Sequence, residues 1–538
     1  LVEGDEPTMA ALRLNENEQD IVGHIVHEME QERGLDREAA MADMRYTYIE
    51  GICQTAVVKP QVSREQLRSR KVDAVLLGRY TAFPIFAGIL ALVFFLTFGP
   101  VGQSLSNLMA NAIHGLSDLV NGALVYAEVN PLLRSLVVDG IFAGVGTVLS
   151  FLSLGLPLGI SFYLFQTMGY CIDVYRGKAK AQRNFLKFAL FTTYFPYLIQ
   201  GPISAYGKLE GQLYTSHDFD GKQWSFGIQR MLWGYFKKLV IADRIAPLIA
   251  SLRAPELGGM GFFLLTLSYA VQIYGDFTGG IDMTIGMSES LGICLPENFI
   301  RPYFSKNIAE YWRRWHISLG EWMKDYIFYP ISVSGPMLRL SKTARARLGN
   351  FGKRLPVYVA SLATWFVTGI WHGLTPNFIL WGMLNCLFIV GSEECAPLYA
   401  RFHNRFHLKE KGWYGSFEIL RMFLLMNFIR ACDLFPHVGD YFAGFGRMLT
   451  NPNFAMLTNG TLLTLGLTGP DFAILGFGIA LLFAVSLYQE KKGSVREALW
   501  SGNVWLRYGL FFLLLLAVLM MGKYGTGYNA GSFIYNQF

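Results

Sequence analysis

Long apolar stretches separated by short polar segments run through this chain from residue 80 to residue 521. A helix needs roughly 20 apolar residues to cross a bilayer, and a shorter stretch is tolerated only where protein or water covers its backbone. The pattern predicts an all-α polytopic membrane protein with about ten or eleven membrane segments and at least one re-entrant or interfacial helix. The predicted segments are 80–98, 135–152, 154–172, 185–203, 231–249, 262–287, 357–371, 377–390, 417–435, 472–487 and 505–521.

A second pattern occupies residues 307–326, where aromatic and aliphatic side chains recur at spacings of three and four while charged residues take the other faces. This spacing predicts one amphipathic helix at the headgroup boundary, with its indoles at the interface and its arginines reaching lipid phosphates. His316 lies on this predicted helix, close to Trp312 and Trp315.

The composition supports a membrane protein. Of the 538 residues, 52% are hydrophobic and 16% are charged, whereas an average soluble protein carries about 25% charged residues. The net charge of +6 is modest, and the lysines and arginines of a membrane protein gather in its cytoplasmic loops, so the surplus indicates topology rather than nucleic-acid binding. The six cysteines are scattered without a CxxC pair, which predicts neither a disulfide framework nor a zinc site.

Residues 1–75 differ from the rest because they are polar, acidic and helix-prone, with helices predicted at 16–33 and 37–53. A basic run at 64–71 comes just before the first membrane segment. The positive-inside rule therefore places this N-terminal segment in the cytoplasm.

A cationic loop is expected at residues 339–354, which hold six lysines and arginines. Such a loop suits a cytoplasmic face, and it also suits the docking of an anionic donor or an acidic carrier protein. The sequence leaves both interpretations open.

His372 stands between Trp371 and Gly373, at the end of an apolar stretch. An ionisable side chain at membrane depth is expensive and marks a functional site by default. A neutral imidazole there accepts a proton from a hydroxyl nucleophile, and a low dielectric favours that neutral form. Gly369 and Gly373 are expected to let a long substrate approach the backbone closely. The alternative is a core histidine with an ordinary hydrogen bond.

Other polar residues carry weaker signals. His316 is either a second functional histidine or an interfacial one that bonds only lipid or backbone. Asp276 and Asp282 lie in apolar sequence, where each either orients a histidine or makes a structural hydrogen bond. His403 and His407 have the i, i+4 spacing of a metal pair, but no carboxylate completes a site, so no metal is predicted.

From about residue 154 to residue 538 the sequence resembles the membrane-bound O-acyltransferase family. Its bacterial branch contains alginate O-acetylation proteins and the D-alanyl transfer proteins of lipoteichoic acid. The matching motifs are LPLGISFY at 156–163, IDVYRG at 172–177, QIYGDF at 272–277, PENFIRPY at 296–303, WRRWHISL at 312–319, WHG at 371–373 and FIYNQF at 533–538.

The resemblance implies a multi-helix fold around a tunnel, in which an acyl group passes from a thioester donor to a hydroxyl. His372 matches the family's essential histidine, and His316 matches its other characteristic histidine. The remaining assignments concern donor and acceptor contacts: Trp312 and Trp315 at the entrance, Trp371 beside the base, Arg313 and Arg314 steering an anionic headgroup or anchoring lipid, and Asn298 and Asp276 orienting polar groups.

The implied reaction is acetyl or D-alanyl transfer to a cell-envelope polysaccharide or teichoic acid in the bacterial cytoplasmic membrane. The donor is a coenzyme A thioester or an acidic acyl carrier protein, and the acceptor is the polymer or a periplasmic or extracellular relay protein. The expectation includes neither a metal nor a tightly bound cofactor.

Residues 1–152 instead resemble part of the ferrous iron transport protein B family, on the motifs MRYTYIE at 44–50, PIF at 84–86, LRSLVVDGI at 133–141 and GVGTVLSFL at 144–152. The resemblance covers the region after the GTPase domain (1–75) and the first membrane helices (76–152), and it precedes an acyltransferase domain at 153–538. The GTPase motifs and the later permease helices are absent from the sequence. Two alternative functions are therefore a truncated iron permease and a non-catalytic membrane scaffold.

Overall fold

The computed structural model describes residues 15–33, 118–127, 160–197 and 200–524, together with a few single residues before position 135. The chain divides into two units, residues 1–95 and residues 96–538. Several sequence-based expectations lie outside the described residues: the basic run at 64–71, the membrane helices at 80–98 and 135–152, and the terminal motif at 533–538. Of the predicted helix at 37–53, only residues 48, 51 and 52 are described.

In the first unit the described helix is α2 (Glu16–Arg33), which has the bounds that the sequence predicts. Its start is fixed by a reciprocal pair of hydrogen bonds. The Glu18 backbone N–H donates to Asn15 Oδ1 at 3.0 Å, and the Asn15 backbone N–H donates to Glu18 Oε2 at 2.8 Å. This pair satisfies two N–H groups that a helix start otherwise leaves open.

The described part of the second unit is built from helices, and its only extended pairing is an isolated bridge between Phe299 and Trp315. Within the described ranges, the helices that concern the site and its surroundings are α9 (Ile160–Tyr175), α10 (Phe185–Thr192), α11 (Tyr206–Leu213), α12 (Gly221–Tyr235), α13 (Asp243–Leu252), α14 (Gly258–Ser290), α15 (Ile308–Arg314), α16 (Ile317–Met323), α17 (Tyr329–Ser332), α18 (Gly335–Leu348), α19 (Asn350–His372), α20 (Pro376–Glu394), α21 (Ala396–Phe406), α22 (Tyr414–Arg430), α23 (Val438–Thr450), α24 (Gly469–Lys492), α25 (Val495–Trp500) and α26 (Val504–Met521).

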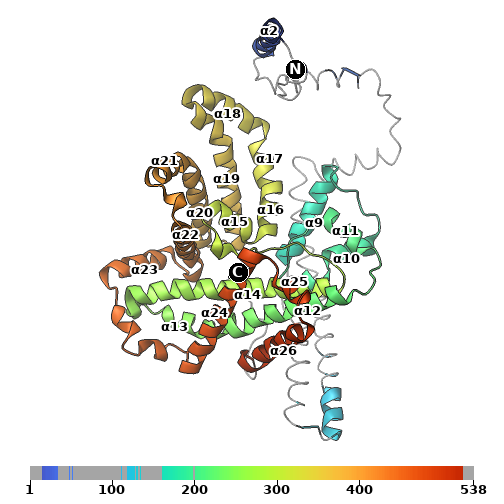
Figure 1. Ribbon diagram of the computed structural model, residues 1–538, viewed down its shortest axis with the longest axis vertical. Helices are drawn as coiled ribbons and strands as arrows, with labels where there is room; N and C mark the ends of the chain where they lie inside the picture. The colour runs from blue at the N-terminus through green and yellow to red at the C-terminus, as the bar shows by residue number, and fades with distance from the viewer. Residues whose placement is uncertain are drawn as a thin grey trace. The chain divides into compact units, whose positions relative to one another are not determined.

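The 33-residue helix α14 is the centre of this unit, with α12 and α13 packed along it (Figure 1). Glycines let α12 come close. A Cβ built on Gly286 would lie 2.6 Å from the Gly227 carbonyl oxygen, and one built on Gly234 would lie 2.6 Å from the Gly279 carbonyl oxygen. Gly227 and Gly234 are seven residues apart on α12, and Gly279 and Gly286 are seven residues apart on α14. The two close contacts between the helices therefore lie two turns apart. Small residues at such a crossing permit the close packing that membrane helices use.

Between α12 and α13 the chain forms a π-helix, η3 (Phe236–Ala242). The sequence predicts a single membrane segment over 231–249, whereas the structure joins three helical pieces there. The π-turn holds Lys237 and Lys238, both buried, against α14. An apolar count cannot anticipate this break, because it is stabilised by carboxylates of another helix.

Among the described residues, three helices are long and apolar enough to cross a membrane: Pro255–Ser290, Gly469–Lys492 and Val504–Met521. A fourth candidate is the pair α20 and α21, which is bent by 56°. The structure is therefore consistent with an all-α membrane protein. The larger number of segments and the tunnel stay predictions.

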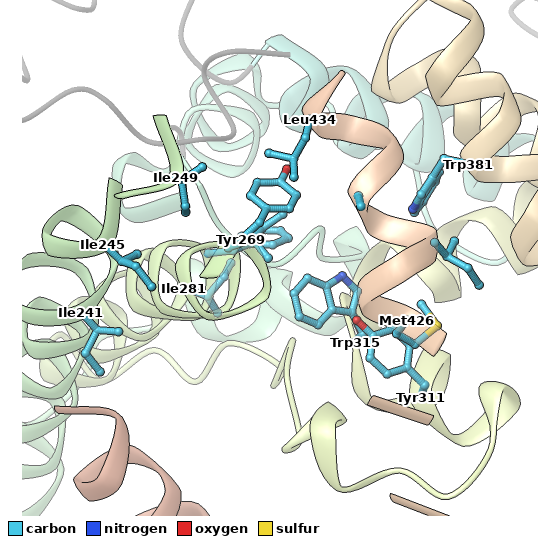
Figure 2. Close-up of a cluster of buried hydrophobic side chains, with 14 of the residues drawn as sticks. Ile241, Ile245, Ile249, Tyr269, Ile281, Tyr311, Trp315, Trp381, Met426 and Leu434 are labelled. Carbon is cyan, nitrogen blue, oxygen red and sulfur yellow. The ribbon is translucent and has the colours of Figure 1, made fainter. Parts of the chain in front are cut away.

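The core joins α14, α22 and the segment around α15. Figure 2 shows Trp315 and Tyr311 next to Met426, whose helix is α22. Tyr311 and Trp315 stack with their ring centroids 5.7 Å apart and an interplanar angle of 11°. This aromatic packing holds the segment that carries His316.

Two expected elements are wrong in shape. Residues 339–354, expected as a loop, form most of α18 and the start of α19, which meet at Gly349 with φ 56°. Residues 307–326, expected as one helix, form α15, α16 and part of a π-helix, η6 (Lys324–Phe328). In both places a left-handed or extended residue interrupts the helical repeat, which side-chain periodicity does not report.

Candidate active site

Two motifs that are separate in sequence lie side by side. The Phe299–Trp315 bridge is flanked by two backbone hydrogen bonds, from Ile300 N–H to the Arg314 carbonyl oxygen at 2.9 Å and from Ile317 N–H to the Asn298 carbonyl oxygen at 3.0 Å. The segment 296–301 thus lies against the break between α15 and α16. The pairing explains why the predicted helix stops at Trp315: the chain there is extended and bonded to another segment.

Asn298 stabilises the break between α15 and α16 through hydrogen bonds. It is fully buried, and its Oδ1 accepts hydrogen bonds from both the backbone N–H and the hydroxyl of Ser318, each at 3.0 Å. The same oxygen lies 3.4 Å from His316 Nδ1. An amide oxygen beside Nδ1 favours the tautomer that carries its proton on Nδ1, which leaves Nε2 as the proton acceptor.

His316 itself has a left-handed backbone, with φ 47° and ψ 51°. Such a conformation costs a non-glycine residue about 1–2 kcal/mol and recurs at functional sites. The side chain is 3% exposed and lies in the loop between α15 and α16, outside the candidate membrane spans. Burial lowers the pKa of His316 well below its ordinary 6.5, and the charges of His372 and Arg430 act in the same direction.

His372 is the last residue of α19, and its ring is surrounded by aromatic side chains. Its centroid lies 4.7 Å from that of Trp371, 4.8 Å from that of Trp381 and 6.2 Å from that of Phe378. The Trp371 ring also lies 6.4 Å from the His316 ring. The structure therefore brings both histidines to the same indole, one from α19 and one from the break before α16.

Gly369 and Gly373 do not offer room to a substrate, contrary to the expectation. A Cβ on Gly369 would lie 2.7 Å from the Phe378 carbonyl oxygen, and a Cβ on Gly373 would lie 2.4 Å from the Phe378 ring. Helix α20 fills the space beside both glycines. Their close approach serves the packing of α19 on α20 and thereby the position of His372.

Trp315 is buried and Trp312 is partly buried. The Trp312 indole N–H donates to Asn385 Oδ1 at 3.1 Å, and its ring packs 4.7 Å from that of Trp365. Trp315 is 3% exposed, and the Arg430 guanidinium lies 4.3 Å from its ring centroid. These contacts support the walls around the histidines.

Arg313 and Arg314 have different surroundings. Arg313 is exposed, whereas Arg314 bonds Glu490 of α24 at 2.9 Å and Glu310 of its own helix at 2.7 Å. Arg301 bonds the same Glu490 at 2.6 Å. Arg314 thus ties the histidine segment to α24, which is a structural contact, and Arg313 faces outward.

Asp276 is 1% exposed and bonds Lys238 of the π-helix at 2.5 Å, while Lys238 also bonds Asp243 at 2.8 Å. Asp282 pairs with Lys237 at 2.6 Å and with Arg230 at 2.9 Å. Both carboxylates therefore hold α14 to the α12–η3–α13 segment. Asp276 is connected to the site through its neighbour Phe277, whose ring lies 4.9 Å from that of His316.

Arg430 is a residue that the sequence argument misses. It is 6% exposed, and its Nε and Nη2 atoms have no hydrogen-bond partner among the described residues. A buried guanidinium beside Trp315 adds positive charge next to both histidines. The sequence does contain one indication that Arg430 is functional, because it is a cation inside the apolar stretch 417–435.

The described residues contain no cluster of three or more metal-ligating side chains. His403 bonds the Tyr414 hydroxyl at 2.8 Å, and the exposed His407 lies 3.4 Å from Glu410. His403 on α21 and His407 directly after it therefore each contact another side chain, the hydroxyl of Tyr414 and the carboxylate of Glu410.

The buried His316 and the partly buried His372 thus lie near one indole, in a helical protein with candidate membrane spans. Residues 178–432 match the model of the membrane-bound O-acyltransferase family, and the matched region contains both histidines. Residues 1–58 match the FeoB cytosolic helical domain.

Three named relatives are similar to this chain. A probable alginate O-acetylase of Azotobacter vinelandii is 38% identical over 231 residues, covering 42% of each protein. A peptidoglycan O-acetyltransferase of Helicobacter pylori is 30% identical over 311 residues, covering 53% of this chain and 55% of the relative. A teichoic acid D-alanyltransferase of Bacillus subtilis is 27% identical over 277 residues, covering 50% and 67%. The chain thus spans less than half the length of the first of these relatives.

Proposed function

We propose that this protein transfers an acyl group from a thioester donor to hydroxyl groups of a cell-envelope polymer at the bacterial cytoplasmic membrane. The observation that carries the proposal is the placement of His316 and His372 beside the same Trp371 ring, within the region that matches the family. A tunnel between the helices would bring donor and acceptor to this pair.

In the proposed reaction, His372 removes the proton of the acceptor hydroxyl as its oxygen attacks the thioester carbonyl carbon. The tetrahedral intermediate then collapses, the C–S bond breaks, and the thiolate takes the proton from the His372 imidazolium. His316 Nε2, oriented by Asn298 on the opposite ring nitrogen, positions donor or acceptor or assists the proton transfer. This scheme uses neither a metal nor a tightly bound cofactor.

The acyl group and the donor are proposed as classes. The relatives' names include both acetyl and D-alanyl transfer and three polymers: alginate, peptidoglycan and teichoic acid. A coenzyme A thioester and an acidic acyl carrier protein both fit. The basic helix α18, with Arg339, Lys342, Arg345 and Arg347, supports the carrier. The acceptor is the polymer itself or an extracellular relay protein.

The test is the content of ester-linked acyl groups in the envelope polymers of cells that express wild type or His372→Ala at equal membrane levels. We expect the ester groups in wild-type cells and their loss, by at least a hundredfold, in the variant, since a general base contributes about 10²–10⁴-fold. His407→Asn is the matched control, because His407 is exposed and left-handed, and asparagine tolerates that backbone. Equal acylation by wild type and His372→Ala would reject the proposed role of His372.

The match of residues 1–58 to a domain of an iron transporter favours a second candidate, transport of ferrous iron. Iron uptake by cells expressing wild type and His372→Ala separates the two. Uptake that requires residues 1–152 and is indifferent to His372, together with no acylation, would favour transport.

A further inference from the structure

A cavity of about 630 Å³ lies between α12, α14, α24 and α26, beside the segment 297–301. Neither histidine lines it. Phe299 connects the two places, since it lines the cavity and its ring stacks on that of His316 with the centroids 6.4 Å apart. Helices α24 and α26 contact η3, and α26 also contacts α12, so these helices border the cavity together with α14.

One end of the cavity is cationic. Its lining contains five cationic side chains and two carboxylates: Arg230, Lys237, Arg301, Arg496 and Arg507, with Asp282 and Glu297. Most of these cations are already paired: Arg230 with Asp282 and Glu297, Lys237 with Asp282, Arg301 with Glu490 and Arg496 with Glu289.

Arg507 is different, because no carboxylate bonds it in the part of the chain that the structure describes. Its guanidinium lies 4.1 Å from the Trp500 ring centroid and 5.0 Å from that of Tyr508. Its Nε is buried and makes no hydrogen bond to a described residue. A guanidinium that lies over aromatic rings and has free N–H donors is suited to bind a phosphate.

The cationic end also lies at the level where headgroups are expected. Arg507 is in the first turn of α26, a candidate membrane span, and its neighbour Trp505 is 82% exposed. Exposed tryptophan and tyrosine next to a span mark the membrane–water interface. Lys491 and Lys492 end α24, which is another candidate span, and directly precede residues 493–496 of the cavity lining.

Away from this end the lining becomes apolar along both helices. The lining residues of α24 are first polar, Gln489 and Ser486, and then apolar: Val485, Leu482, Leu481 and Phe477. The lining residues of α26 beyond Arg507 are all apolar: Leu510, Phe511, Leu513, Leu514 and Ala517. From residue 477 to residue 485 the helix rises about 12 Å. The cavity therefore changes from charged to apolar in the direction that runs into the bilayer.

We propose that this cavity binds an anionic phospholipid of the surrounding membrane, with the phosphate on Arg507 and an acyl chain between α24 and α26. A cationic pocket between membrane helices is the kind of site that holds such headgroups. The lipid is a bound component distinct from donor and acceptor, and the proposal does not depend on acyl transfer.

The test is native mass spectrometry of the full chain purified in detergent and mixed with equal amounts of phosphatidylglycerol and phosphatidylcholine. We expect wild type to retain at least fivefold more phosphatidylglycerol, the factor expected from one arginine at a headgroup. Arg507→Gln loses this preference and Arg507→Lys keeps most of it. Lys222→Gln removes a cation that does not line the cavity and is the matched control.

A second pair of variants tests the apolar half. Leu482→Trp fills the cavity and lowers retention of both lipids, whereas Leu519→Trp, on an exposed position of α26 outside the lining, changes nothing. Equal retention of the two lipids by wild type, or an unchanged preference in Arg507→Gln, would overturn the proposal. Competition by inorganic phosphate at the same concentration would also overturn it, because the site would then bind a free anion rather than a lipid.

Discussion

At the residue scale, the left-handed backbone of His316 restricts which side chain can stand there. Asparagine adopts this conformation at little cost, whereas a β-branched residue does not. We expect His316→Asn to fold like wild type with acylation reduced at least tenfold, and His316→Val to lose about a further 1–2 kcal/mol of stability through backbone strain.

Thermal unfolding of the purified variants in detergent, together with polymer acylation in cells, measures both effects. The contrast between the two variants separates the imidazole's chemistry from the backbone's requirement. Full acylation by His316→Asn would show that only the backbone shape of this residue matters.

The lowered pKa of His316 predicts a pH dependence of stability. Since the pKa in the folded protein is below the ordinary 6.5, the unfolded chain binds more protons as the pH falls below that value. The contribution of neutral His316 is complete above pH 6.5 and is lost as the pH falls from there toward the folded pKa, at up to about 1.4 kcal/mol per pH unit.

The unfolding temperature measured between pH 8 and pH 5 tests this sign. Wild type should lose more stability than His316→Asn across the lower part of the range, because asparagine does not titrate. Parallel curves for the two proteins would contradict the assignment of a lowered pKa to His316.

At the element scale, the crossing of α12 and α14 depends on glycines. We expect Gly286→Ala to destabilise the protein by about 1–3 kcal/mol, because its methyl group would lie 2.6 Å from the Gly227 carbonyl oxygen and 2.8 Å from the Met231 nitrogen. Backbone atoms cannot move aside as a side chain does, so the two helices must separate.

Gly476→Ala is the matched control, since a Cβ at Gly476 on α24 meets nothing within 4 Å. The same chemical change there should leave the unfolding temperature unchanged or raise it, because alanine is the better helix former. Equal effects of the two substitutions would mean that helix propensity, and not the crossing, decides the result.

At the scale of the whole molecule, Glu490 joins α24 to the histidine segment through Arg301 and Arg314. We expect Glu490→Gln to cost about 1–2 kcal/mol, because it leaves two partly buried guanidinium groups with weakened hydrogen bonds. Glu497→Gln breaks a more exposed pair with Lys222 and should cost less than about 0.5 kcal/mol. The unfolding temperatures of both variants test the difference.

Much of the fold follows from local pattern. The capped helix at 16–33 and the apolar helices that became α14, α24 and α26 were all predictable, because their side-chain composition and periodicity are properties of the segments themselves. The two histidines were recognised from motifs and from the cost of burying an ionisable group.

The rest of the site depends on residues distant in sequence. Asn298 lies 20 residues before the Ser318 that it bonds, Lys238 lies 38 residues before Asp276, and Arg430 reaches Trp315 from another helix. No window of sequence holds both partners. The break at His316 was therefore missed, and Arg430 was not connected to the histidines.

The π-helix at 236–242 makes the protein sensitive to the deletion of a single residue in this stretch. A π-turn holds one more residue than an α-turn, and each residue turns a helix by about 100°. Losing a single codon there would swing α12, with its glycines and Arg230, away from α14, and the two lysines would leave their carboxylates. In a library of one-residue deletions this stretch should stand out as depleted, even at positions whose individual side chains accept replacement.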